Sequence, residues 1–159
     1  MTVRRACAGV LAVMLAAVLV LTGCGIQLPT DPDGSLDRIQ GAVLRAGASP
    51  EQGLVDIDGS DVSGRLAELV VDFAREHDAE VEWTVDSEET LVTGLEEGRL
   101  DVAIGGITSD TPWVDRVGVT RGYPGIPGAA GREVVLLVPM GENRLLSSLE
   151  AFLDRRVGG

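Results

Sequence analysis

The sequence predicts an α/β fold in which a single parallel-type sheet is flanked by helices. Between residues 42 and 138, short β-rich runs alternate with amphipathic helical runs, and the links between them are short. Such strand–helix–strand units form right-handed crossovers, which place the strands in a parallel sheet covered by helices. The run Val102-Ala103-Ile104 has no polar alternation, as expected of a strand buried on both faces. The 159 residues leave room for one such domain.

The first strand is expected at residues 42–48, which are apolar apart from Arg45. Residues 53–61 are rich in turn formers and predict a link. A helix follows over about 64–77, with Ser63 able to cap it. The residues of its buried face recur at helical spacing: Leu66, Leu69, Val70, Phe73 and His77.

Residues 80–85 alternate between polar and apolar side chains and predict the second strand. Asp86 and Glu89 have the spacing of a capping box, so a second helix is expected from there. It runs to about Glu97 and ends at Gly98.

The third strand, 102–104, is followed by a short strand at 117–120. Residues 123–131 predict a loop, because this segment holds five glycines and prolines. Residues 133–138 predict the last strand, which Pro139 ends. A final amphipathic helix is marked by its apolar face: Leu145, Leu146, Leu149, Phe152 and Leu153.

This pattern predicts three consecutive segments, of which only the last is a folded domain. Residues 1–23 are predicted to be a lipoprotein signal peptide, 24–40 a tether with a short helix at 35–40, and 41–159 the α/β lobe. The segment 25–34 holds prolines, glycine and acids, which cannot build a core.

The signal peptide is predicted from the order of its regions. Arg4 and Arg5 precede an uncharged apolar stretch, and Leu21-Thr22-Gly23-Cys24 places small residues before a cysteine. The Cys24 thiol would carry a diacylglyceryl group, and two or more acyl chains anchor a protein stably. The alternative is an uncleaved signal anchor, since residues 6–22 approach the length that spans a bilayer.

The charge of the chain excludes one class of partner. The net charge is −12, and removal of the signal with Arg4 and Arg5 makes it −14. Nucleic-acid affinity depends on many cationic contacts to phosphate, so no nucleic acid is expected. Anionic ligands are disfavoured at long range, although most of these charges serve solubility.

Cofactor and metal sites are not expected either. Cys7 leaves with the signal, and His77 is the single histidine, better explained as a packed or capping residue. An EF-hand loop starting at Asp56 would need glycine at 61 and glutamate at 67, where Asp61 and Ala67 stand, so this segment predicts a solvated turn.

Residues 64–123 resemble the amino-acid type (family 3) of bacterial extracytoplasmic solute-binding proteins, the receptor subunits of ABC importers. The runs that carry the resemblance are Gly64-Arg65-Leu66-Ala67-Glu68-Leu69, Leu95-Glu96-Glu97-Gly98-Arg99-Leu100-Asp101-Val102, Gly105-Gly106-Ile107-Thr108 and Thr120-Arg121-Gly122-Tyr123. The resemblance implies one half of a type II periplasmic-binding-protein fold.

In that family the loop after the third strand offers backbone amides and a threonine hydroxyl to the ligand carboxylate. The resemblance implies these roles for Gly106 and Thr108, and Gly105, Trp113 and Tyr123 complete the candidate ligand-binding set. An arginine normally stands five residues after the threonine and grips the carboxylate. Trp113 stands there instead and cannot neutralise a carboxylate.

A second departure concerns the second lobe, which the family places after the segment matching 120–123. Here only residues 124–132 precede the closing strand, too few for a lobe of on the order of 100 residues. Loss of that lobe predicts weak binding, with no submillimolar affinity for common amino acids. It also predicts an exposed strand-end face that includes Pro50, Gly106, Thr108, Trp113 and Tyr123.

The sequence therefore predicts a membrane-anchored, extracytoplasmic binding protein related to amino-acid importer receptors. It would not be an enzyme and would need no cofactor. Its expected partners are the cell membrane, through lipid, a transporter permease or another membrane protein, and weakly a small solute. The alternative is an interaction or regulatory lipoprotein whose former ligand face binds a membrane protein.

Lipidation gives the first testable prediction. Cys24→Ser removes the thiol that would carry the lipid, so the variant should take up no labelled fatty acid and be either unprocessed or shed. The measurement is metabolic labelling of wild type and variant in parallel. Equal labelling of the two would show that Cys24 is not the acceptor.

Overall fold

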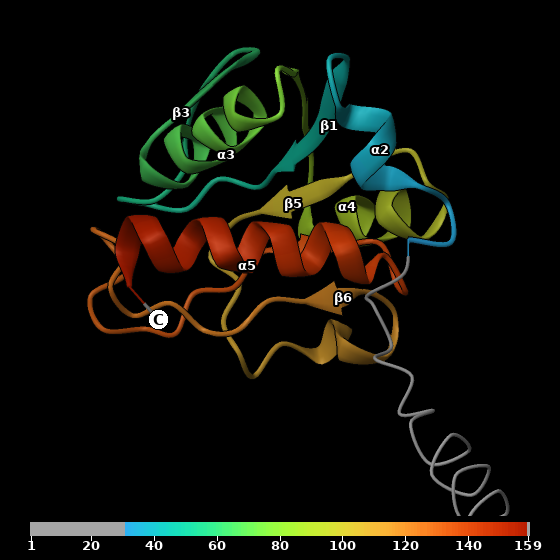
Figure 1. Cartoon of the computed structure of the whole chain (residues 1–159). Helices are drawn as coiled ribbons and strands as arrows, with labels where there is room; N and C mark the ends of the chain where they lie inside the picture. Colours follow the sequence, from blue (N-terminus) through green and yellow to red (C-terminus); the bar gives the residue numbers. More distant parts are fainter. Residues whose placement is uncertain (1–30, 159) are drawn as a thin grey trace, which may run out of the picture.

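Figure 1 shows the computed structural model, which describes residues 31–158. Five strands form a mixed sheet in the order β4-β1-β5-β7-β6. The strands are β1 (Val43–Ala48), β4 (Glu80–Val85), β5 (Val102–Ile104), β6 (Gly118–Val119) and β7 (Leu137–Val138). β1 pairs in parallel with β4 and β5, while β7 runs antiparallel between β5 and β6. The predicted α/β lobe is confirmed, with β7 as the strand that departs from a parallel sheet.

The reason for this departure is the connection before β7. Residues 124–132 form a loop that turns back at the edge where the chain leaves β6, so no crossover helix intervenes and the strand returns antiparallel. The predicted strand 133–138 is shortened to its last two residues. Earlier in the segment, Val134 forms isolated bridges with Thr108 and Tyr123.

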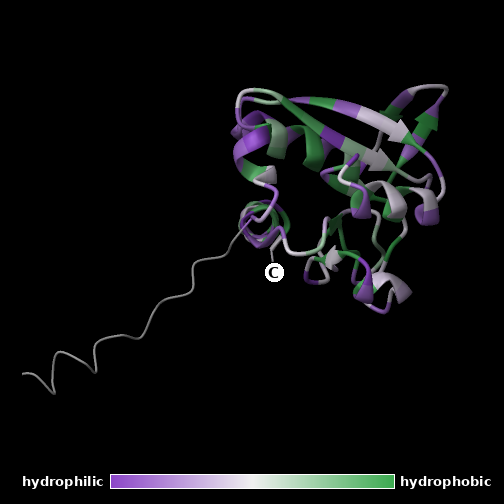
Figure 2. Cartoon of the chain, turned by 90° about the vertical axis from the view of Figure 1, so that its right-hand side faces the viewer, coloured by the Kyte–Doolittle hydropathy of each residue, from purple (hydrophilic) through white to green (hydrophobic). Residues whose placement is uncertain are grey.

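Helices cover both faces of the sheet. They are α2 (Ser35–Ile39), α3 (Arg65–Glu76), α4 (Glu88–Glu96), the 3-10 helix η1 (Pro112–Asp115) and α5 (Asn143–Val157). The apolar faces of α2, α3 and α5 pack into one hydrophobic cluster, and α4 packs into the other. Figure 1 shows α5 lying across one face of the sheet, and Figure 2 shows hydrophobic and hydrophilic residues alternating along the strands and helices.

Two local predictions are corrected by hydrogen bonding. Ser63 does not cap α3; Gly64 precedes the helix, and the Ser63 hydroxyl donates to Asp56 O at 3.4 Å. The N-cap of α4 is Ser87, whose Oγ accepts from Thr90 N at 3.4 Å. Asp86 instead accepts from the backbone N–H of Ser87 at 2.7 Å.

The predicted link at 53–61 contains the hairpin β2 (Asp56–Asp58) and β3 (Asp61–Ser63). Ile57 and Val62 pack against the core, while the acids of the hairpin stay exposed. The turn that joins the strands uses Gly59 at φ 64°, a left-handed conformation that glycine adopts without strain.

Residues 31–40, assigned from sequence to the tether, pack against the lobe. The buried Glu142 carboxylate accepts from Asp33 N at 2.9 Å and Ser35 N at 2.8 Å. The Asp31 carboxylate accepts from Arg144 N at 2.9 Å and so caps the start of α5. These reciprocal caps satisfy backbone donors at the starts of both helices.

The buried carboxylate of Asp101 ties α2, β1 and β5 together. Its oxygens accept from Arg45 Nη2 at 2.7 Å, Arg45 N at 2.9 Å and Arg38 Nη1 at 2.8 Å. Burial alone would raise the pKa of Asp101, but the hydrogen bonds from Arg45 and Arg38 outweigh burial and hold the pKa below its usual range. The charged form is therefore the one that stabilises the fold.

Within residues 31–158, no helix combines the length and the apolar character that crossing a bilayer requires. Cys24, the signal peptide 1–23 and the first part of the tether lie outside the described residues. Their lipidation and processing therefore stay predictions.

Asp101→Asn should lower the free energy of unfolding at pH 7 by roughly 1.5–3 kcal/mol, because charge-assisted hydrogen bonds are lost from a buried group. The matched control is Glu97→Gln, which breaks an exposed pair with Arg99 and should cost less than about 1 kcal/mol. Urea denaturation measures both variants.

The Asp101 effect should also depend on pH. Its folded pKa lies below the unfolded value, so its contribution is complete above an unfolded pKa of about 3.9. It is lost as pH falls through the lower folded pKa. The gap between wild type and Asp101→Asn should thus close in acid; a gap that widens there would contradict the assignment.

Candidate functional site

The carboxyl ends of β1 and β5 meet at one edge of the sheet, together with the start of the segment that leads into β7. Ser49 N donates to Ile104 O at 2.9 Å, which joins the two strand ends. The loop after β5 comprises residues 105–109. It is joined to the segment before β7, because Ser109 N donates to Glu133 O at 3.0 Å. In α/β sheets this edge is where ligands bind, because loops from separate strands converge there.

A tight turn after β1 brings Glu51 to this edge. Glu51 N donates to Val55 O at 3.0 Å, and Val55 N donates back to Glu51 O at 2.8 Å, so the backbone of Glu51 is fixed. Its carboxylate lies over Gly106. A Cβ at Gly106 would stand 2.5 Å from Glu51 Oε2, so only glycine at position 106 leaves room for this carboxylate.

The short loop 124–132 supplies the positive charge. Arg132 Nη2 lies 2.8 Å from Glu51 Oε1, and Arg132 Nε donates to Ala129 O at 3.2 Å. The loop packs closely on the turn after β1: a Cβ at Gly128 would stand 2.1 Å from Gly53 O. The loop 124–132 thus reaches back over the strand ends.

The other donors of this edge also face acids. The Thr108 hydroxyl donates to Asp110 Oδ1, and the Ser109 hydroxyl donates to Glu133 Oε2 at 2.8 Å. We call the following group the strand-end site: Glu51, Gly106, Thr108, Ser109, Arg132 and Glu133. Chemically it is a concentration of carboxylates and hydroxyls around one guanidinium, suited to polar, charged small molecules.

Every arginine among the described residues forms an ion pair with an acidic side chain. The chain has thirteen basic residues, all arginine, and each one from Arg38 to Arg156 lies within 4.0 Å of a carboxylate. Arg116, the basic residue nearest to Trp113 in sequence, donates from Nε to Glu96 Oε1 at 2.8 Å. Its guanidinium is therefore bound to α4 and not to the loop 105–109.

The candidate residues are only partly brought together. Gly105, Gly106 and Thr108 form the loop of the strand-end site. Trp113 is half-buried, lies against the hydrophobic cluster of α4, and has its Nε1 3.5 Å from Glu88 Oε2. Arg116 covers the Trp113 ring at 5.4 Å. Pro50 is exposed, as expected.

The expectation that Tyr123 is exposed is wrong. Its ring is fully buried in the cluster formed with α5, and its hydroxyl donates to Glu150 O at 3.2 Å. Burial raises the pKa of Tyr123 to about 12, and the Arg121 guanidinium nearby opposes that rise. Only the backbone of Tyr123 reaches the site edge, through its bridge to Val134.

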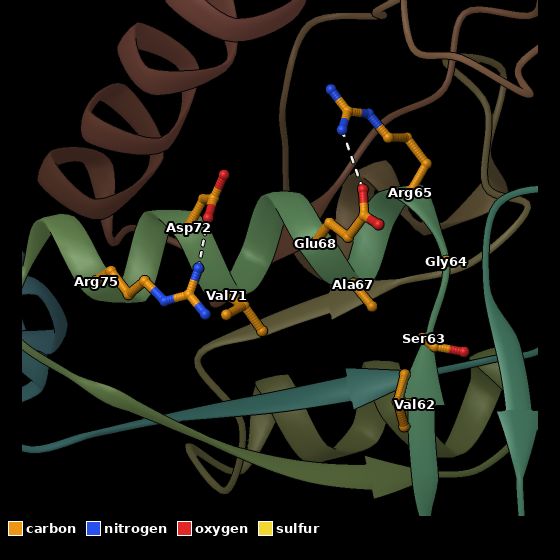
Figure 3. A pocket seen from close by; sticks show the side chains of 9 residues that line it. All are labelled: Val62, Ser63, Gly64, Arg65, Ala67, Glu68, Val71, Asp72 and Arg75. Atoms are coloured by element: carbon orange, nitrogen blue, oxygen red, sulfur yellow. Dashed lines mark hydrogen bonds and ion pairs between the residues drawn. The ribbon is translucent and has the colours of Figure 1, made fainter.

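Two hollows of the surface lie elsewhere. One of about 360 Å³ is lined by β3 and the outer face of α3, where Figure 3 shows its charged side chains paired along the helix, Arg65 with Glu68 and Arg75 with Asp72. Another of about 370 Å³ lies at the opposite edge of the sheet, beside Arg38 and Arg45. Both contain paired charges and neither includes the loop 105–109.

No group of three or more metal-ligating side chains occurs among residues 31–158. Sequence reasoning missed Glu51, Ser109, Arg132 and Glu133 as site residues. The signal for Glu51 was its place directly after the first strand; Arg132 and Glu133 lie in a loop and a strand start that carry no motif.

No family model matches the sequence, and no curated protein matches it. Solved structures are similar. A point mutant of arginine-bound domain 1 from TmArgBP gives a TM-score of 0.66 at 21% identity, covering 76% of this chain and 96% of that chain. Another structure of arginine-bound domain 1 from TmArgBP gives 0.62 at 19%, covering 74% and 95%.

The fold is that of a periplasmic-binding-protein domain. A longer similar structure, an ancestral cyclohexadienyl dehydratase, gives a TM-score of 0.51 at 20% identity. It matches 61% of this chain, but the match spans only 40% of that protein. The full-length protein is thus matched over one part, whereas the isolated domain 1 is matched almost from end to end.

The packing of loop 124–132 gives a prediction with a matched control. Gly128→Ala and Gly131→Ala both place a side chain at positive φ, 94° and 80°, which costs about 1–2 kcal/mol. Gly131 has open space around it, whereas Gly128 meets Gly53 O. Gly128→Ala should therefore be the more destabilising in thermal unfolding; equal losses would mean that the loop does not press on the turn after β1.

Proposed function

We propose that this chain is a lipid-anchored, extracytoplasmic binding protein that holds a small amino-acid-like solute at the strand-end site and catalyses no reaction. The observation that carries the proposal is the convergence at one sheet edge of Arg132, three carboxylates and the hydroxyls of loop 105–109. A zwitterionic or cationic solute offers both signs of charge and can be matched by this arrangement.

The single lobe is compatible with such binding. The similar domain 1 from TmArgBP is described as arginine-bound, so a lone domain of that protein holds an amino acid. In this chain the charges of Glu51, Asp110 and Glu133 lie on the same edge as the loop. They favour a solute with a cationic group.

Binding should nevertheless be weak. Trp113 packs toward α4 rather than gripping a carboxylate, and no second lobe is present in residues 31–158 to desolvate the solute. Each lost hydrogen bond to a charged group costs roughly 1.5–3 kcal/mol, so affinity falls by about tenfold or more per bond. We expect millimolar dissociation constants.

A hydrolytic function is not supported by the histidine. His77 Nε2 lies 3.3 Å from Ser148 Oγ, which resembles a nucleophile and base. Its other ring nitrogen faces the amide oxygen of Gln40 at 3.3 Å, not a carboxylate. Ser148 also lies in the middle of α5, where backbone N–H groups are used by the helix and cannot form an oxyanion hole.

The test is an NMR titration of the ¹⁵N-labelled full chain in detergent with L-arginine, L-leucine and L-glutamate. L-Arginine should shift the amides of residues 105–109 with a dissociation constant of about 1–10 mM. Thr108→Val removes the hydroxyl and should weaken binding, while Thr84→Val on edge strand β4 should not. No shift at the strand-end site with any of the three would refute solute binding.

A second candidate function rests on Val114, which is 51% exposed on η1 beside the half-buried Trp113. An exposed apolar side chain at this place suits a membrane-protein partner, as in the interaction-lipoprotein alternative. The titration, combined with crosslinking in membranes, separates the two functions. A negative titration, together with an in-membrane crosslink that Val114→Asp abolishes, would favour the second.

A further inference from the structure

We infer that Arg132 is the carboxylate-binding residue of the strand-end site, and that Glu51 fills the carboxylate position until a ligand carboxylate displaces it. This inference rests on the proposed function and specifies its chemistry. The ligand class is a small molecule with a free carboxylate, such as the α-carboxylate of an amino acid.

The position is already known to hold a carboxylate, because it holds that of Glu51. One oxygen, Oε1, receives Arg132 Nη2 at 2.8 Å, and the other, Oε2, lies against Gly106, where a Cβ would be 2.5 Å away. The absence of a side chain at Gly106 and the guanidinium opposite it together form a cradle of carboxylate size. Glu51 is in this sense an internal copy of the ligand's acid group.

Arg132 keeps its place without Glu51. Its Nε donates to Ala129 O at 3.2 Å, and its backbone N donates to the same oxygen at 3.0 Å, so the side chain is held by its own loop. The loop in turn packs on the turn after β1 through Gly128 and Gly53. A carboxylate that replaces Glu51 would therefore meet a guanidinium that is already oriented.

Exchange is feasible because water reaches both partners. The side chain of Glu51 is 31% exposed and that of Arg132 is 40% exposed. Exposed ion pairs are weak, so an external carboxylate can compete. Glu51 can swing away on its flexible side chain, while its backbone stays in the turn that ends at Val55.

The two arginines nearest in sequence to Trp113 and Tyr123 are bound elsewhere. Arg121 donates from Nη2 to Asp154 Oδ2 at 2.7 Å on α5, and Arg116 binds Glu96 on α4. Arg132 is thus the one arginine, among those of residues 31–158, whose carboxylate partner lies over the loop 105–109.

The test uses sodium acetate, against sodium chloride at equal ionic strength, and the ¹⁵N-labelled full chain in detergent. In Glu51→Gln the internal competitor loses its charge, so acetate should bind tighter than in wild type by up to about fivefold, the factor that an exposed pair of up to about 1 kcal/mol represents. The shifts should appear at Arg132 Nε–Hε and at the Gly106 amide.

Two further variants complete the test. Arg132→Gln added to Glu51→Gln should abolish the gain, and an unchanged amide spectrum elsewhere verifies folding. Glu97→Gln is the matched control, because it releases Arg99 from an exposed pair of 2.7 Å outside the strand-end site. Its acetate response at residues 105–109 should equal that of wild type.

The inference is overturned if Glu51→Gln binds acetate no tighter than wild type. It is equally overturned if the gain survives Arg132→Gln, or if Glu97→Gln gains as much affinity at Arg99. Its failure differs from failure of the proposed function. Wild type that binds L-arginine with no effect of Glu51→Gln on acetate refutes the inference alone, whereas an acetate response without any amino-acid binding refutes the proposed function alone.

Discussion

The return of the chain through residues 133–138 is the constraint on which both layers of the lobe depend. Alternate side chains of this segment belong to different clusters: Val134, Leu136 and Val138 pack with α2, α3 and α5, and Val135 and Leu137 pack with α4. All are fully buried, and each burial contributes roughly 1.5–3 kcal/mol. The segment lies between β5 and β6, so the sheet would be interrupted without it. The hydrophobic clusters on both faces of the sheet would also lose central side chains.

The short return also shapes the chemistry of the sheet edge. Loop 124–132 has to close on the strand ends, and its contact with the turn after β1 brings Arg132 to Glu51. The same pairing extends over residues 31–158, where each arginine lies beside an acidic side chain. Only acidic residues are in excess, because the chain has more of them than arginines. A ligand at the strand-end site would therefore have to displace one of the protein's own acidic groups to reach an arginine.

Local periodicity explains which parts of the fold were predictable. The helix expected at 64–77 is α3, Arg65–Glu76, and the buried run 102–104 is β5, because burial patterns repeat within a few residues. The hairpin at Asp56–Ser63 was missed, although its two-residue loop, Gly59-Ser60, is a known hairpin signal. The strand-end loop could be placed from its glycines and threonine. The contacts of Glu51 with Arg132, and the inward turn of Tyr123, depend on packing between segments far apart in sequence, which no local pattern encodes.

Segment 31–40, which is hydrogen-bonded to the lobe, determines which edge of the sheet a membrane anchor on Cys24 would hold near the bilayer. Asp31 is fixed at the start of α5, at the edge of the sheet opposite the strand-end site. Six residues lie between Cys24 and Asp31, and the seven Cα–Cα steps reach at most about 25 Å. A lipid on Cys24 would hold the amino edge of the sheet close to the bilayer and point the carboxyl edge outward. Solutes would then approach from the side away from the membrane, whereas a membrane protein could reach the same edge only with a part that rises above the lobe.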